Sequence, residues 1–263
     1  MNTFLDGWFV LQTLLAEYYE KAGHGPAPNL AITNLPPDIS AGADANEIGG
    51  TLPEEWQKAF KAAQKLPDGR ARMALAFALG EWPVWTAGGD EQHPYLEDPK
   101  ALQEAMYNTL LLISWSPGGA ARTMFENSAQ GQQLSWNENI DYAAYFENVN
   151  PAVKNAVEVL YQVAGLGPQA DIQRINEASG VLASTHALEY WGAAGRNVVG
   201  DPEIPVFRLH GLGDHQIPYT LMPGYEDLAA KNGKEDLLRT ALHWIGHQSR
   251  RKYLGGRSYE PTV

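Results

Sequence analysis

The chain has 263 residues, no cysteine and a formal net charge of −12, from 19 Lys and Arg against 31 Asp and Glu. This length allows one large domain or a core with a cap, and the acidity argues against nucleic-acid binding, which needs clustered positive charge. Without cysteine the chain offers no disulfide, thiolate metal site or cysteine nucleophile. It has no membrane-spanning apolar run and no basic signal-peptide region, so we expect no membrane partner and favour a cytoplasmic location.

The first predicted elements are a helix and a short strand. Apolar residues recur at helical spacing over residues 6–22, and Gly23 suits the end of that helix. Residues 30–32 form a short apolar run between prolines, which predicts a strand.

From residue 38 to about 200 the pattern predicts helices and no convincing strand. Prolines, acids and capping residues mark the predicted helix starts. These starts are Pro53-Glu54-Glu55, Asp68, Asp98-Pro99, Asn150-Pro151 and Ser184.

From residue 204 the pattern changes to alternating strand and helix. We predict a strand over 205–210, a loop with Asp214, a helix over about 219–231 and a strand over 237–243. This alternation indicates a parallel sheet. The first strand is apolar with little alternation, so we expect it to be covered on both faces.

Asp214 and His247 are the candidate catalytic residues. Each follows a predicted strand, and ligands of open α/β sheets bind outside the carboxyl ends of the strands. A serine hydroxyl needs an imidazole to take its proton and a carboxylate to orient that imidazole. An isolated loop aspartate is usually an ordinary surface residue, but the histidine about thirty residues later favours a functional role. His210 and His243, inside the predicted strands, are expected to be hydrogen-bonded structural histidines.

The stretch 205–218, PVFRLHGLGDHQIP, followed by Gly246-His247, resembles the acid-and-histidine end of the α/β-hydrolase family. The resemblance implies a serine hydrolase that cleaves a carboxylic ester or amide through an acyl-enzyme. Asp214 would be the orienting acid and His247 the general base. No metal or cofactor is expected.

A second resemblance concerns the helical block. Residues 52–80, with Ser135-Trp136-Asn137 and Asp141-Tyr142-Ala143, are similar to the large helical cap of some bacterial members of the family. The fold class is therefore expected to be α/β, a partial α/β-hydrolase parallel sheet with a large inserted all-helical cap. The expected domains are a first core segment 1–37, a helical cap 38–203, and a core segment 204–263 with the acid and histidine.

The nucleophile is missing from this pattern. Family members carry G-x-S-x-G ahead of the acid and histidine, and this chain has no such motif. The Gly-adjacent Ser116 and Ser128 lie in the helical block with no strand before them. Three explanations are open: a fragment, a subunit of a split hydrolase whose second chain supplies the serine, or an inactive descendant. The competing hypothesis is a non-catalytic helical binding or assembly protein.

Four aromatic residues are candidates for substrate binding. Trp82, Trp85, Trp136 and Tyr142 would line an apolar pocket suited to a small acyl or aryl substrate. The alternative is that they belong to the core, as aromatic residues at helical spacing usually do.

Overall fold

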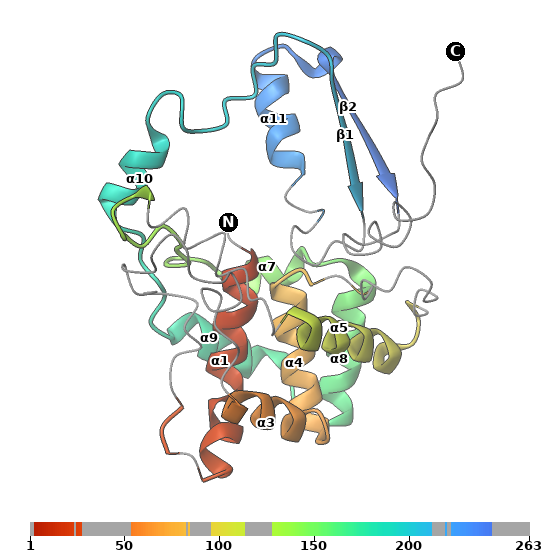
Figure 1. Ribbon diagram of the computed structural model, residues 1–263. Coiled ribbons are helices and arrows are strands. Elements are labelled where there is room, and N and C mark those ends of the chain that lie inside the picture. The colour runs from red at the N-terminus through yellow and green to blue at the C-terminus, as the bar shows by residue number, and fades with distance from the viewer. Residues whose placement is uncertain are drawn as a thin grey trace, which may run out of the picture. The chain divides into compact units, whose positions relative to one another are not determined.

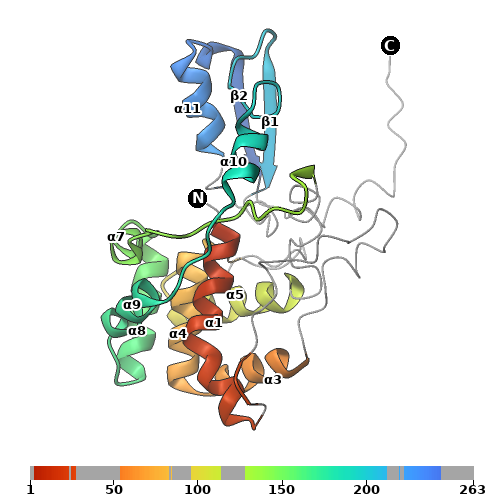
Figure 2. The ribbon, with the colours of Figure 1, turned by 90° about the vertical axis from the view of Figure 1, so that its left-hand side faces the viewer.

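The computed structural model describes residues 3–23, 25–27, 54–82, 84, 96–113, 128–211, 219 and 222–243. The chain divides into two compact units, each treated by itself below. The first comprises Met1–Trp82 and Pro94–Asn197, and the second comprises Pro83–His93 and Val198–Val263. The described part is mostly helical with one two-stranded parallel sheet, which is compatible with a partial α/β fold (Figures 1 and 2).

Helix α4, Pro67–Leu79, is the central helix of the first unit. It contacts α1 (Thr3–Lys21), α3 (Glu54–Ala63), α5 (Pro99–Ile113) and α8 (Pro151–Val163). A helix surrounded by other helices is apolar on all sides rather than along one stripe. The buried residues of α4 accordingly include Met73, Leu75, Phe77 and Leu79, whose spacing of two fits no single helical face.

The helix starts and stops agree well with the sequence signals. Helix α1 buries the apolar residues of the predicted 6–22 helix, and Gly23 follows it at φ 87°, a conformation that favours glycine. The side chain of Asn150 caps α8 by accepting from the backbone N–H of Ala152. Asp68 lies in the first turn of α4, whose first residue is Pro67, so the predicted start is one residue late.

The described part of the first unit also contains three shorter helices. They are α7 (Tyr142–Glu147), α9 (Pro168–Glu177) and α10 (Thr185–Gly192). Ser184 caps α10 and that helix ends at Gly192, as predicted. No separate starts were predicted for α7 and α9. None of the described helices is long and apolar enough to cross a membrane.

The second unit contains a strand–helix–strand arrangement. Strands β1 (Val206–Gly211) and β2 (Leu238–His243) pair in parallel, with Val206 opposite Leu238 and Gly211 opposite His243. Helix α11 (Pro223–Lys231) and the short 3₁₀ helix η2 (Glu235–Leu237) connect them. The predicted strands and their parallel pairing are confirmed, while the predicted 219–231 helix begins later, at Pro223.

One expectation for β1 is wrong. We expected both faces of this strand to be covered, but Phe207 is 70% exposed and Leu209 is 50% exposed. Strand side chains alternate between faces, and among the described residues only the face of Val206, Arg208 and His210 is covered.

Two further expectations, the strand at residues 30–32 and the domain boundaries, stay predictions. The strand predicted at residues 30–32 lies outside the described residues. The domain boundaries at 37/38 and 203/204 stay a prediction.

Candidate functional site

The two strands of the second unit end side by side. Gly211 closes β1, His243 closes β2, and the two residues are register partners. Asp214 comes three residues after Gly211 in the chain, and His247 comes four residues after His243. Both predicted catalytic residues lie outside the described residues, as does Trp85, so their roles stay predictions.

His210 is buried near the end of β1. It is 8% exposed, and its ring centroid lies 6.1 Å from that of Tyr219. Its Nε2 atom is buried without a hydrogen-bond partner, so the expectation of a hydrogen-bonded structural histidine is not met at that atom. Burying a polar atom without a hydrogen-bond partner costs folding free energy, so the environment of His210 Nε2 is unusual for a structural histidine.

Tyr142 belongs to a buried polar network in the first unit. Its hydroxyl donates to Asp6 Oδ1 at 2.7 Å and accepts from Asn137 Nδ2 at 3.0 Å. Asn137 in turn is fixed by Val181, whose N–H donates to Asn137 Oδ1 at 2.6 Å. Asp6, Asn137 and Tyr142 are 0%, 3% and 2% exposed, so the network is closed to solvent.

Helix α7 is held so that it presents Tyr142 to this network. Asp141 caps the helix by accepting from the N–H groups of Ala143 and Ala144 at 3.0 and 3.2 Å. The N–H of Tyr142 donates to Asn176 Oδ1 on α9 at 3.0 Å, and the Tyr142 ring stacks on Phe9 of α1. The segment therefore connects α1, α7 and α9.

Burial changes the acidity of this network. It raises the pKa of Asp6 from 3.8 to about 6, although the hydrogen bond from Tyr142 acts in the opposite direction. Burial, followed by the charge of Asp6, raises the pKa of Tyr142, so this hydroxyl remains a donor. The second oxygen of Asp6, Oδ2, is buried without a hydrogen-bond partner. Asp6 is thus a buried carboxyl group whose pKa lies well above its ordinary value, at about 6.

The other predicted binding aromatics differ in exposure. Trp82 is 4% exposed, with its ring stacked on Phe77 at 4.9 Å and edge-on to Trp8 at 5.6 Å. Gly7 and Gly80 bring α1 and the end of α4 close to it, because a Cβ on either glycine would lie 2.7 Å from Trp82 Nε1. Trp136 is 43% exposed. Substrate binding by Trp82, Trp136 and Tyr142 stays a prediction.

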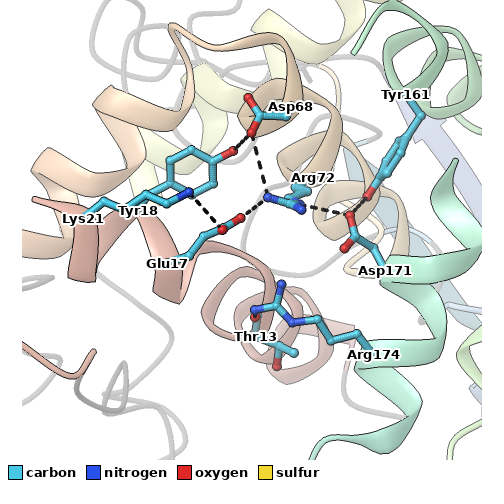
Figure 3. A network of polar contacts seen from close by, with 9 residues as sticks. All are labelled: Thr13, Glu17, Tyr18, Lys21, Asp68, Arg72, Tyr161, Asp171 and Arg174. Carbon is cyan, nitrogen blue, oxygen red and sulfur yellow. Dashed lines mark hydrogen bonds and ion pairs between the residues drawn. The ribbon is translucent and has the colours of Figure 1, made fainter. Parts of the chain in front are cut away.

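A second network surrounds Arg72 on α4 (Figure 3). The guanidinium contacts Glu17 of α1, and its Nε donates to Asp171 Oδ2 of α9 at 3.0 Å. Asp171 Oδ2 also accepts from the Tyr161 hydroxyl at 2.9 Å, and Tyr18 donates to Asp68 at 2.5 Å. The network therefore joins α1, α4, α8 and α9.

The charges of this second network compensate one another. Burial alone would lower the pKa of Arg72, but the hydrogen bond and charge of Asp171 and the charge of Glu17 outweigh it and raise that pKa. Burial, then the charge of Asp171, raises the pKa of Tyr161 well above its usual value. Arg72 lies between acids from three helices, Glu17 of α1, Asp68 of α4 and Asp171 of α9, so the network serves to hold these helices together.

The sequence analysis did not predict the two residues at the centres of these polar networks, Asp6 and Arg72. An acid in the first turn of a helix is common because it suits the helix dipole, so Asp6 carried no local signal of burial. An arginine in an apolar stretch could have indicated Arg72, but its partners lie 55 and 99 residues away.

Comparison with known proteins finds a relative whose name is that of an amidase. Over 242 residues the chain is 55% identical to a protein of Xanthobacter agilis named o-phthalyl amidase. The match covers 92% of this chain and 53% of that relative, so the chain spans about half the relative's length. No family model matches the chain, and no solved structure matches it.

Proposed function

We propose that this chain is the acid-and-histidine part of a serine amidase that hydrolyses carboxylic amides with an aromatic acyl group. The observation that carries the proposal is the 55% identity, over 92% of the chain, to a protein named o-phthalyl amidase. The substrate class follows that name, and an o-phthalyl amide is the compound to test first. An aromatic-lined pocket would suit such an acyl group.

The strand register supports the pairing of Asp214 with His247. Neighbouring strands lie about 4.8 Å apart, and a chain spans at most about 3.5 Å per residue. Three residues after Gly211 and four after His243 therefore keep both side chains within reach of one edge of the sheet. In this proposal Asp214 accepts a hydrogen bond from the imidazole of His247 and stabilises its protonated form.

The proposed reaction has two halves. His247 takes the proton of a serine hydroxyl as its oxygen attacks the amide carbon, then gives the proton to the nitrogen of the leaving amine as the C–N bond breaks. Water then attacks the acyl-enzyme while His247 takes a proton from it. The carboxylic acid leaves, and the proton returns to the serine oxygen.

The serine is proposed to lie outside this chain. No G-x-S-x-G motif occurs in the sequence, and close to half of the relative lies outside the match. A strand–helix–strand unit with parallel strands is the kind of element from which an α/β-hydrolase sheet is built. This supports the partial α/β-hydrolase assignment.

A fluorophosphonate probe tests the proposal. The full-length protein for the test is a chimaera in which this chain replaces the matching stretch of the X. agilis amidase. The chimaera should be labelled on a serine outside this chain and should release the amine from an o-phthalyl amide, while the chain alone should not be labelled. A chimaera that cleaves the amide without reacting with the probe would contradict the serine mechanism. A folded chimaera without turnover would favour a non-catalytic protein.

A further inference from the structure

The C-terminal end of α11 is held by the side chain of Asn232, the residue directly after the helix. Its Nδ2 group donates to the carbonyl oxygens of Val199 at 2.8 Å, of Gly200 at 3.2 Å and of Leu228, in α11 itself, at 3.0 Å. The side-chain amide therefore joins the segment before β1 to the end of the helix that follows β1 (Figure 1). Gly200 lies directly on that helix, because a Cβ there would be 2.4 Å from Leu228 Cβ.

Asn232 is followed by a glycine, and this is the single Asn-Gly pair in the sequence. An asparagine before glycine is chemically labile, because glycine has no side chain to hinder attack by its own backbone nitrogen. That nitrogen, of Gly233, loses its proton and bonds to Cγ of Asn232, while the C–Nδ2 bond breaks and ammonia leaves. Water then opens the cyclic imide at either carbonyl, which gives an aspartate or an isoaspartate. Asn232 is exposed, so water has access to it.

The folded backbone holds this pair in an unreactive geometry. At ψ 2° for Asn232, the nitrogen of Gly233 is eclipsed with the nitrogen of Asn232 and points away from its side chain. Attack on Cγ requires this torsion to rotate until the nitrogen lies beside Cβ. The rotation would break the bond from the Gly233 N–H to the carbonyl of Ala230, which is 2.9 Å long. Gly233 has φ 68° and ends the helix, so the capped end of α11 opposes the reaction.

We propose that Asn232 is a latent deamidation site, protected while the end of α11 is closed and reactive once it opens. The site has no part in the proposed reaction. Conversion to aspartate would replace the amide donor by a carboxylate that faces three carbonyl oxygens, at the end of a helix where the dipole opposes negative charge. Isoaspartate would also lengthen the backbone by one methylene group within the turn. Either product would release residues 199–200 from α11, so a transient opening would become permanent.

Deamidation of the parent chain can be followed at mildly alkaline pH by peptide mass spectrometry, in buffer and in guanidinium chloride. In the unfolded chain we expect Asn232 to deamidate faster than every other asparagine. In the folded chain its rate should be lower by roughly tenfold or more, because the end of the helix must open first. Asn197, which is exposed and followed by valine, is the internal control and should react slowly in both conditions. Equal rates for Asn232 in the two conditions would overturn the proposal, as would a faster asparagine elsewhere in the unfolded chain.

Two substitutions test the consequence of the modification. Asn232→Asp reproduces the deamidated side chain, and Asn197→Asp adds the same charge where Nδ2 donates to the carbonyl of Gly192 at 3.5 Å. Hydrogen exchange of the backbone amides at positions 232–234, which close the end of α11, should become roughly tenfold faster in Asn232→Asp and stay unchanged in Asn197→Asp. Asn232→Ala removes the same contacts without adding charge and serves as a second variant if Asn232→Asp does not fold. Unchanged exchange in the folded variant at position 232 would overturn the proposed release.

Discussion

Asp6 and Tyr142 meet across 136 residues of sequence, with the tyrosine hydroxyl 2.7 Å from a carboxylate oxygen that is closed to solvent. Asp6 comes from the first turn of α1 and Tyr142 from the first residue of α7. The contact fixes a residue that the sequence had proposed for substrate binding. It also leaves a carboxyl group of unusual acidity in the core.

The stability of the protein should depend on the protonation of Asp6. Burial is the main cause that raises the pKa of Asp6 from 3.8 to about 6, so the folded state binds the proton more tightly than the unfolded state does. The free energy of unfolding should therefore fall as pH rises from about 4 to about 6, by roughly 3 kcal/mol in total from this group. Urea unfolding at several pH values should show this decline in the parent protein and its loss in Asp6→Asn.

Two variants complete this test. Glu104→Gln removes a solvent-exposed carboxylate of α5 and should leave the decline unchanged. Tyr142→Phe removes the donor that lowers the pKa of Asp6, so the decline should extend to higher pH, and the lost hydrogen bond should cost about 1–3 kcal/mol at neutral pH. An unchanged pH dependence in Asp6→Asn would show that another group is responsible.

Replacing Arg72 should be strongly destabilising. Its side chain is 16% exposed and pairs with Glu17 and Asp171, so Arg72→Met would leave Asp171 without its cation and Glu17 with only the exposed Lys21 among the described residues. We expect a loss of about 3–5 kcal/mol in the free energy of unfolding. Arg72→Lys should recover only part of it, because an ammonium lacks the fork that donates in two directions.

The matched control for Arg72 is Lys58→Met. Lys58 pairs with Glu54 at 2.8 Å on the surface of α3, where its side chain is 57% exposed. Exposed pairs of this kind contribute little to stability, so thermal unfolding should hardly change. Equal effects of the two substitutions would contradict the structural role of the Arg72 network.

The close approach of α1 and α4 depends on glycine. A Cβ at Gly80 would lie 2.7 Å from the Cα of Gly7, so Gly80→Ala should force the helices apart at a cost of about 1–3 kcal/mol. The backbone of Gly80 has φ −87°, which alanine adopts freely, so the cost is steric. Gly192→Ala at the end of α10 meets no atom within 4 Å and should be nearly neutral in the same denaturant assay.

His247 should be essential for turnover in the full-length chimaera. His247→Ala removes the proposed base and should lower kcat by roughly six orders of magnitude, and Asp214→Asn should lower it by roughly four. Thermal unfolding should change little, which separates chemistry from folding. His186→Ala, at an exposed position of α10, is the control and should retain activity. An active His247→Ala enzyme would refute the proposed role.

The local structure of this chain could be read from its sequence, because the signals that set it are local. Helical spacing predicted α1, a capping serine predicted α10, and apolar runs joined by a helix predicted the parallel pair β1 and β2. The pairing of Asp214 with His247 was proposed from the same kind of spacing and stays a prediction, because both residues lie outside the part of the chain that the structure describes. Helix α9 was missed, because Gly167, where its N-cap lies, makes no side-chain cap.

Tertiary structure decided which polar groups are buried and which apolar groups are not. No residue near Asp6 in the sequence predicts its contact with Tyr142, and none near Arg72 predicts its contact with Asp171. Each contact joins helices that meet only after the chain has folded. The exposure of Phe207 could not be predicted from the sequence either. An apolar run indicates that a strand can be buried on both faces, but it does not show whether a second layer of structure covers the second face.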